Sequence, residues 1–298
     1  MTQTPSPDPA LARRHYRLGL LLAGSGGVCL SFGGLIVRNI ETDDGFLILA
    51  VRSLAYAATL LVFLVLRYRG ALFRPFRDIG LLGLINVPIM GFGFTCYLFG
   101  LMLTTVANAV FIVSLSPLFA AAIGWLALRE RVPPATLLAI ALALGGVGVM
   151  VSGGLAGEGL AGMLVALGAP IALSILVVSQ RYRPAVDMVP AVLLGGLVAG
   201  AIALPFIETW TMSGRDLALT VVMGVGQVGA GFILLTLGAR WLPPAQTTLL
   251  SLGESLLAPL WVWLFVAEVP SLPTLAGGAM ILIAVAGQAA IGLRQAKG

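Results

Sequence analysis

Ten apolar segments, each about as long as a membrane-spanning helix, constrain the fold of this chain more than any other feature. A helix needs roughly 20 apolar residues to cross about 30 Å of hydrocarbon. Charged residues make up 10% of the chain, against about 25% in soluble domains, so most of the surface faces lipid. The sequence therefore predicts an all-α integral membrane protein with ten transmembrane helices. They lie near 18–37, 45–66, 79–100, 104–127, 134–152, 159–180, 189–206, 217–238, 245–266 and 272–292.

The distribution of basic residues tests this division, because cytoplasmic loops of membrane proteins collect Lys and Arg. With a cytoplasmic N-terminus, fourteen of the 17 basic residues fall on the cytoplasmic side. Arg38 and Arg215 fall on the outer side, and Arg52 lies within a span. The bias predicts that both termini are cytoplasmic, in a bacterial inner (plasma) membrane. The fourteen are Arg13, Arg14, Arg17, Arg67, Arg69, Arg74, Arg77, Arg129, Arg131, Arg181, Arg183, Arg240, Arg294 and Lys297.

The chain also contains an internal repeat. A shift of 138 positions superposes GFGFTCYLFG, at 91–100, on GAGFILLTLG, at 229–238, and it brings Glu130 onto Glu268 without a gap. Because each half has five spans, an odd number, the second half enters the membrane inverted. We expect a disordered cytoplasmic lead and then two inverted five-helix repeats in one bundle, a recurring architecture of secondary transporters. The expected boundaries are 1–14, 15–152 and 153–294.

A glycine motif within the eighth span resembles a dinucleotide-binding loop. In MGVGQVGAGF, Gly224, Gly226 and Gly229 have the G-x-G-x-x-G spacing, which binds a pyrophosphate only where a strand ends and a helix begins. No charged residue lies between Leu217 and Gly238, so the motif is predicted to lie inside a helix. There, glycine lets helices approach closely or leaves room for a solute.

Two segments carry a family resemblance. SLSPLFAAAIGWLALRERV, at 114–132, and SLGESLLAPLWVWLFVAEV, at 251–269, resemble the paired signature segments of the EamA type within the drug/metabolite transporter superfamily. The chain is similar in size and layout to the bacterial aromatic amino-acid exporters. The resemblance implies export of small metabolites through a cavity lined mostly by the third, fourth, eighth and ninth spans. Ser255 departs from the family pattern, in which a proline often follows the glutamate.

Glu254 is the candidate for a central functional group. An ionisable residue inside a span costs roughly 2.5–3.5 kcal/mol on insertion scales and tends to face the protein interior. At 1.5 Å per residue, Glu254 lies about 14 Å into the ninth span, near the midplane. Thr247, Ser251 and Glu254 share one helix face. Glu254 is expected either to bind a substrate ammonium group or a proton, or to brace neighbouring helices, for example through Arg52.

Other polar residues of the spans extend the candidate pathway. Arg52 and Tyr56, one turn apart in the second span, favour a structural or charge-pairing role, in which Arg52 meets a substrate carboxylate or an outer acid such as Asp43 or Asp44. Asn86, Met90 and Tyr97 share a face of the third span, and Gln227 is central in the eighth. Such a mixture suits a small amphiphilic solute, although it also occurs as polar glue between helices.

Four prolines inside spans are candidate hinges or static kinks, because each removes a backbone hydrogen bond. Glu130 and Glu268 end corresponding spans and are expected to hold a helix end or a neighbouring loop. The prolines are Pro88, Pro117, Pro170 and Pro259.

Several function classes are excluded by the sequence. The only histidine, His15, precedes the first span, and no carboxylate cluster lies within the membrane, so we expect no enzyme, catalytic residue, metal site or cofactor. The basic residues lie in short loops, which does not favour nucleic acid. The expected partners are lipid, a small-molecule substrate and, as a coupling ion, a proton. The predicted function is export of small metabolites, amino acids first, by alternating access; a drug or cationic-compound exporter, a passive channel and a lipid flippase stay open as alternatives.

Overall fold

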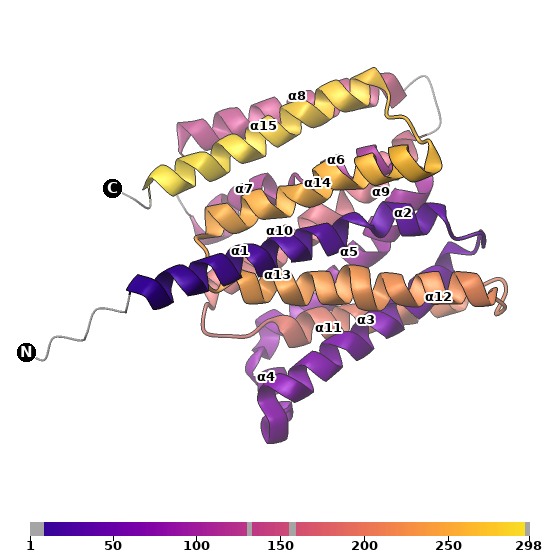
Figure 1. Cartoon of the computed structure of the whole chain (residues 1–298), viewed down its shortest axis with the longest axis horizontal. Coiled ribbons are helices and arrows are strands. Elements are labelled where there is room, and N and C mark those ends of the chain that lie inside the picture. Colours follow the sequence, from indigo (N-terminus) through magenta and orange to yellow (C-terminus); the bar gives the residue numbers. More distant parts are fainter. Residues whose placement is uncertain (1–8, 130–132, 155–158, 296–298) are drawn as a thin grey trace, which may run out of the picture.

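The computed structural model describes residues 9–129, 133–154 and 159–295, and every regular element within these ranges is helical (Figure 1). Ten helices are long and apolar enough to cross a membrane, which confirms the predicted fold class. These spans are Arg13–Arg38, Gly45–Ala71, Gly80–Leu103, Val106–Leu128, Pro134–Ser152, Leu160–Tyr182, Val189–Phe206, Gly214–Ala239, Gln246–Val266 and Leu272–Ile291. Their ends agree with the predicted ends to within a few residues.

Several spans consist of more than one helical element. The first contains α1 and α2, the fourth α6 and α7, the sixth α9 and α10, and the eighth α12, the π-helix η3 and α13. In chain order the elements are α1 (Pro9–Ser31), α2 (Gly33–Arg38), α3 (Gly45–Tyr68), η1 (Arg69–Ala71), α4 (Phe73–Asp78), α5 (Gly80–Leu103), α6 (Val106–Val113), α7 (Ser116–Leu128), α8 (Pro134–Gly154), α9 (Leu160–Ala166), α10 (Gly168–Tyr182), α11 (Val189–Ala203), η2 (Leu204–Phe206), α12 (Gly214–Val222), η3 (Met223–Ala230), α13 (Gly231–Ala239), α14 (Pro244–Val266) and α15 (Leu272–Gln295).

The first helix begins earlier than expected. A disordered lead was predicted over residues 1–14, of which 1–8 lie outside the described residues, whereas 9–14 form the first turns of α1. Pro9 stands at the first helical position, where its fixed φ suits a helix start, and the Ala-Leu-Ala that follows has a high helix propensity. The three prolines of the segment therefore did not prevent helix formation beyond the last of them.

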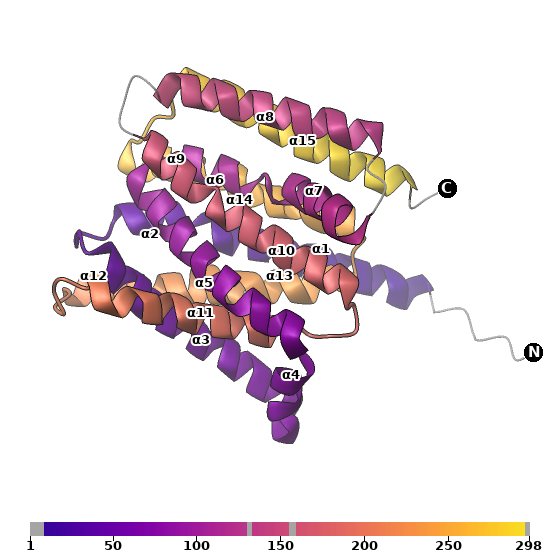
Figure 2. The ribbon, with the colours of Figure 1, turned by 180° about the vertical axis from the view of Figure 1, so that it is seen from behind.

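Corresponding spans of the two halves make corresponding contacts with the opposite half. α1 packs against α13, and correspondingly α5 packs against α9 and α10. α3 packs against η3 as α11 packs against α5, while α8 and α15 pack against each other at one side of the bundle (Figures 1 and 2). α1 begins and α15 ends at the same end of the bundle (Figures 1 and 2). This arrangement is consistent with the predicted inverted repeat.

The outer surface of the bundle is apolar. Large hydrophobic side chains with more than 60% of their area exposed occur on spans throughout the chain, among them Leu66, Leu81, Leu126, Phe265 and Ile283. In water such a surface would be far larger than the apolar patches that soluble monomers expose. It fits a protein whose outer face contacts lipid.

Four spans are interrupted within their length. The first breaks at Phe32, before a pair of glycines, and the fourth breaks at Ser114 and Leu115. The sixth breaks at Leu167, and the eighth changes to a π-helix. Glycine pairs, prolines and π-turns are the usual causes of such breaks. Each break frees backbone groups that lipid cannot hydrogen-bond, so side chains of the protein must satisfy them.

The prolines predicted as hinges or kinks divide into two pairs. Pro117 lies in the first turn of α7 and Pro170 in the first turn of α10, directly after the breaks of their spans. Pro88 and Pro259 lie within the continuous helices α5 and α14. Only the first pair coincides with an interruption of the helix, and whether any of the four serves as a hinge stays a prediction.

The glycine motif lies inside a span, as predicted, and there it forms the π-helix η3. A Cβ atom on Gly224 would lie 2.5 Å from the carbonyl oxygen of Arg52, and one on Gly229 would lie 2.8 Å from Cγ2 of Thr59. Both neighbours belong to α3. These two glycines therefore allow close contact between η3 and α3. The π-helix itself was not predicted; such turns are rare and occur frequently at functional sites.

We expect Gly224→Ala to destabilise the folded protein by about 1–3 kcal/mol, because the added methyl group overpacks the contact with α3. Gly226 is the matched control in the same π-helix, since a Cβ there would meet its nearest atom at 3.9 Å. The two variants are heated in detergent, and size-exclusion chromatography measures the fraction that remains folded at each temperature. Equal unfolding midpoints would show that the contact is not tight.

Candidate functional site

Five polar or aromatic residues from four spans lie near the middle of the bundle; we call Arg52, Tyr56, Tyr97, Gln227 and Glu254 the central cluster. The hydroxyl group of Tyr97, on α5, donates a hydrogen bond of 3.2 Å to Oε1 of Glu254, on α14. The guanidinium carbon of Arg52, on α3, lies 5.5 Å from the centre of the Tyr97 ring. Tyr97 therefore contacts both charged residues of the membrane interior, one through its ring and one through its hydroxyl.

Arg52 is buried, with 3% of its area exposed. Its Nε and Nη1 atoms have no hydrogen-bond partner, and the hydroxyl group of the buried Tyr56 has none either. The ring of Tyr56 packs edge-on against Phe94, with 5.2 Å between the ring centres. Two donors of a buried guanidinium group are therefore left without an acceptor among the described residues, which is costly.

The direct Arg52–Glu254 brace considered from the sequence does not form, because Tyr97 contacts both residues in place of a direct contact. Asp44, the other proposed partner of Arg52, caps the N-terminus of α3. Its Oδ1 accepts hydrogen bonds from the backbone of Phe46 and Leu47, and its Oδ2 accepts from Glu208 and Thr209. Burial raises the pKa of Asp44, but these four N–H groups together outweigh it, and the pKa lies below its ordinary value.

Gln227, in η3, joins the central cluster to the break in the first span. It is 3% exposed, and its Nε2 donates a hydrogen bond of 2.9 Å to the carbonyl oxygen of Leu30. A Cβ atom on Gly33 would lie 2.8 Å from the Tyr97 hydroxyl and 2.9 Å from Nε2 of Gln227, so α2 begins in contact with both. Gln227 thus supports the interrupted backbone, while its Oε1 has no hydrogen-bond partner.

The break in the fourth span is supported by Ser255, the residue that departs from the family's proline. The Ser255 hydroxyl forms a short hydrogen bond with the hydroxyl of Ser114 and donates one of 3.3 Å to the carbonyl oxygen of Val110. Similarly, the indole N–H of Trp261 donates to Ser31 at the first break, over 2.9 Å. No sequence pattern predicted a role for Ser31, Ser114 or Trp261. The available signal was a serine beside a glycine pair or beside a proline inside a span.

Thr247 and Ser251, on the polar face of α14, line a pocket at the end of the bundle that carries the chain termini. Its volume is about 270 Å³, and Leu235, Ala239 and Thr248 complete its lining. The Ser251 hydroxyl donates to the carbonyl oxygen of Thr248, over 2.8 Å, whereas the Thr247 hydroxyl has no partner. Ser251 lies three residues, less than one helical turn, from Glu254. The lining of the pocket therefore comes within one helical turn of Glu254 along α14.

Asn86 and Met90, on the third span, lie away from Glu254. The Asn86 amide donates to the Ser179 hydroxyl of α10, over 2.9 Å, and to the carbonyl oxygen of Leu82, over 2.8 Å. Met90 is 1% exposed in a core shared with Tyr56 and Leu193. Of the predicted face of α5, the structure brings only Tyr97 to Glu254, and these contacts of Asn86 match the role of polar glue between helices.

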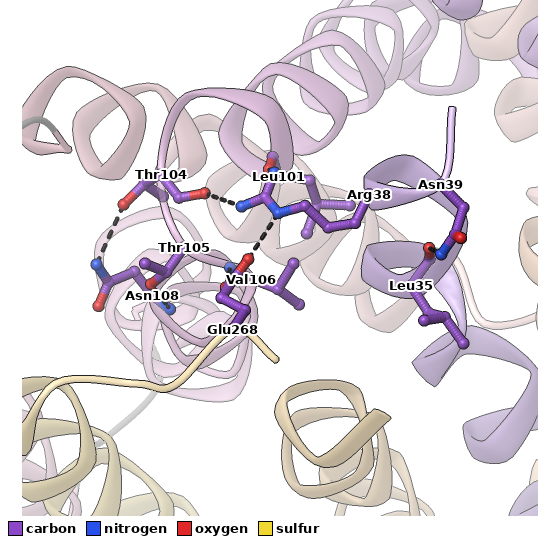
Figure 3. Close-up of polar contacts among 9 residues, drawn as sticks. All are labelled: Leu35, Arg38, Asn39, Leu101, Thr104, Thr105, Val106, Asn108 and Glu268. Atoms are coloured by element: carbon purple, nitrogen blue, oxygen red, sulfur yellow. Dashed lines mark hydrogen bonds and ion pairs between the residues drawn. The ribbon is translucent and has the colours of Figure 1, made fainter. Parts of the chain in front are cut away.

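A second group of polar contacts, centred on two charged residues, lies at the end of the bundle opposite the chain termini. Figure 3 shows these contacts in detail. We call Arg38, Leu101, Thr104, Val106 and Glu268 the distal cluster. Nε of Arg38 contacts Oε2 of Glu268 at 2.6 Å, and its Nη atoms donate to the carbonyl oxygens of Leu101 and Thr104 at 2.8 and 2.7 Å. Oε1 of Glu268 accepts from the backbone N–H of Val106 at 2.7 Å. Glu268 holds a helix start, as expected; Glu130 lies outside the described residues.

Two further features of the described part of the chain do not form a solute site. A hollow of about 550 Å³ beside α1 is lined by Arg13, Arg14, Arg17, Leu18 and Leu21, all from one helix at the end of a span, where basic residues meet lipid headgroups. Among residues 9–129, 133–154 and 159–295, no group of three or more His, Cys, Asp and Glu side chains is placed to hold a metal ion.

Comparisons with known proteins agree with this architecture. Residues 17–152 match the EamA-like transporter family, whereas curated proteins gave no match. Among solved structures, one described as "Crystal structure of protein" superposes with a TM-score of 0.63 at 20% sequence identity. The match covers 93% of this chain and 98% of the other, so it shows a common fold.

The family match coincides with the first five spans, and the shared fold extends over nearly the whole ten-span chain. This family match confirms the predicted resemblance to the EamA type over residues 17–152 and indicates a membrane transporter of small molecules.

Proposed function

We propose that this protein exports small zwitterionic metabolites, neutral amino acids first among them, across a bacterial inner membrane by alternating access. The observation that carries the proposal is that Tyr97 contacts both Arg52 and Glu254 in the central cluster. One positive and one negative side chain match the carboxylate and ammonium groups of an amino acid. Neither end of such a solute would leave an unpaired charge in the membrane interior, where charges are costly.

The chemistry of the central cluster favours an amino acid over the other solutes considered. A cationic drug would pair with Glu254 but would leave Nε and Nη1 of Arg52 without partners. The rings of Tyr56, Tyr97 and Phe94 lie beside the two charges, and aromatic surfaces suit an apolar or aromatic side chain. A solute with both charges and an aromatic group would use every one of these features.

The pathway that we propose runs from the pocket at Thr247 and Ser251 to Glu254. The polar face of α14 connects the two, and the distal cluster lies beyond Glu254 at the other end of the bundle. Two inverted halves would exchange roles to open the centre to either end in turn. With both termini in the cytoplasm, the pocket is the cytoplasmic entrance, and a proton on Glu254 is the candidate coupling ion.

Counterflow in proteoliposomes tests the proposal. Purified protein is reconstituted, loaded with one unlabelled amino acid and supplied outside with a trace of the same labelled compound, over a panel of neutral, aromatic, acidic and basic amino acids and organic cations. Accumulation of label driven by the internal compound requires an alternating carrier. A passive channel gives no such stimulation, and a flippase moves labelled lipid in place of amino acids, so either result would replace the proposed function.

Gln227→Ala is expected to change substrate preference and to lower stability by about 1–3 kcal/mol, because the buried carbonyl oxygen of Leu30 loses its donor. Gln227→Met, which keeps the volume without the hydrogen bond, is the matched variant. Counterflow across the amino-acid panel and thermal unfolding measure the two effects. Unchanged preference with lowered stability in both variants would assign Gln227 to helix support alone.

A further inference from the structure

We propose that the ion pair between Arg38 and Glu268 is the gate at the end of the bundle opposite the chain termini. It closes when the half-helices α2 and α6 lie against the end of α14, and it opens when they move away. The inference rests on the proposed function, because a gate has meaning only for a solute pathway. It adds a moving part and the residues that hold it closed.

The contacts of the distal cluster join four spans at one point. Arg38 ends α2 of the first span, and its guanidinium group bonds two carbonyl oxygens at the end of α5 and the carboxylate of Glu268 beyond α14 (Figure 3). Glu268 also holds the first N–H of α6. The carboxylate therefore connects the ends of the first, fourth and ninth spans.

The two elements held by Glu268 are half-helices with breaks behind them. α2 has 6 residues and is separated from α1 at Phe32; α6 has 8 residues and is separated from α7 at Ser114. Interrupted helices in transporters lie at the binding site and allow one half to move without the other. The gate is therefore attached to the two short elements that are best placed to rotate about the middle of the membrane.

α2 and α6 are built to move together. Gly34 of α2 faces Val106 of α6 so closely that a Cβ atom at position 34 would overlap the valine side chain. Buried apolar residues beneath the ion pair, among them Val37, Leu101 and Ala258, separate it from the central cluster. Moving the two half-helices outward would withdraw Val37 from this core and expose the other buried residues to solvent.

The start of α2 also contacts the central cluster, which couples the gate to the solute site. Gly33 lies against the Tyr97 hydroxyl and the Gln227 amide, and Tyr97 donates to Glu254. A displacement of α2 would therefore change the surroundings of the carboxylate that we propose to bind the solute. Occupation of that site and opening of the gate would influence each other through this one contact.

The exposure of the ion pair suits a contact that breaks and re-forms. The side chains of Arg38 and Glu268 are 23% and 17% exposed, so water can reach them when they separate. Partly hydrated pairs contribute little to stability, whereas a buried pair is strongly destabilising to break. The alternative is a static brace, in which the pair never opens in the folded protein.

Labelling of a cysteine beneath the gate distinguishes the two. Cys29 and Cys96 are free and are replaced by alanine; Ala258, 1% exposed and one turn beyond Glu254 in α14, is replaced by cysteine as the reporter. A membrane-impermeant maleimide is added on the side opposite the termini. We expect Arg38→Gln and Glu268→Gln each to increase the labelling rate about tenfold, a shift of about 1.4 kcal/mol toward the open state, with no further increase in the double variant.

The exposed ion pair between Arg215 and Glu41 at the same end provides the control. Glu41→Gln should leave the labelling rate unchanged. Unchanged rates in both Arg38→Gln and Glu268→Gln, or an equal increase in Glu41→Gln, would overturn the gate. If the variants fail to fold, the ionic strength is varied with the reporter protein alone, where salt should accelerate labelling; a rate independent of salt would indicate a static brace.

Because labelling needs no substrate, the gate and the proposed function fail separately. Faster labelling in both gate variants without counterflow of any amino acid in the panel would support the gate and refute the proposed amino-acid substrate. Normal counterflow with unchanged labelling would refute the gate and leave the transport proposal intact.

Discussion

Glu254→Gln is expected to abolish counterflow, with a loss of about 100-fold or more, while folded protein remains in the membrane. Without the carboxylate, the ammonium group of a bound solute would lose its charged partner, which costs about 3–5 kcal/mol for a buried pair, and each 1.4 kcal/mol is a factor of ten. Glutamine keeps the size of the side chain and can still accept the hydrogen bond from Tyr97. The expected loss would therefore report the carboxylate charge and not the packing of α14.

Two comparisons make the Glu254 result specific. Glu208→Gln changes an exposed carboxylate outside the spans and should transport normally. Tyr97→Phe removes the only hydrogen bond that the protein donates to Glu254 among the contacts described and should weaken transport without abolishing it. Initial rates of counterflow at acidic, neutral and alkaline pH measure the effect. Normal transport by Glu254→Gln at every pH would mean that Glu254 is a helix brace.

Arg52→Gln is expected to reduce counterflow of neutral amino acids about 100-fold, because the carboxylate of the bound solute would then be a buried charge without a partner. Amines that resemble these amino acids but lack the carboxylate should be affected much less, because they have no group for the guanidinium to bind. The ratio of the two rates, and not either rate alone, is therefore the diagnostic measurement. Arg52→Lys should give a ratio between those of the wild type and Arg52→Gln, because lysine keeps the positive charge but cannot form a bidentate contact with a carboxylate.

Arg67 is the matched control for Arg52 on the same helix. It pairs with Asp187 at 3.2 Å near the other end of α3, outside the central cluster. Arg67→Gln should change stability slightly and leave the ratio of amino acid to amine unchanged. If Arg52→Gln lowers both rates equally in a protein that still folds, the guanidinium group supports the bundle and does not select the solute.

The sequence alone predicted the spans and several local features. Each span is recognised because the thickness of the bilayer sets the length of the apolar segment. The effects of glycine and proline are predictable because they change the backbone conformation at their own positions. The interior position of MGVGQVGAGF was predictable for this reason, as was the helix-end contact of Glu268, which accepts from Val106. The π-turn was not, because it depends on how tightly η3 meets α3.

The candidate site was predictable residue by residue but not as a set of contacts. Glu254 and Tyr97 were selected separately, and the structure brings them together, whereas Asn86 on the same face as Tyr97 contacts α10. A span that is apolar on nearly every side carries little information about which face is turned inward. Small differences in rotation and crossing angle then decide which polar groups meet.

The amino-acid sequence by itself determined that ten helices cross a membrane and which ionisable residues lie within it, because both follow from the cost of placing polar groups in hydrocarbon. Only the tertiary structure decided that Arg52 meets the ring of Tyr97, that Gln227 supports the break at Leu30 and that Arg38 meets Glu268 across 230 positions of the chain. Those contacts depend on where the helices break and how they pack, and no local pattern of residues encodes that.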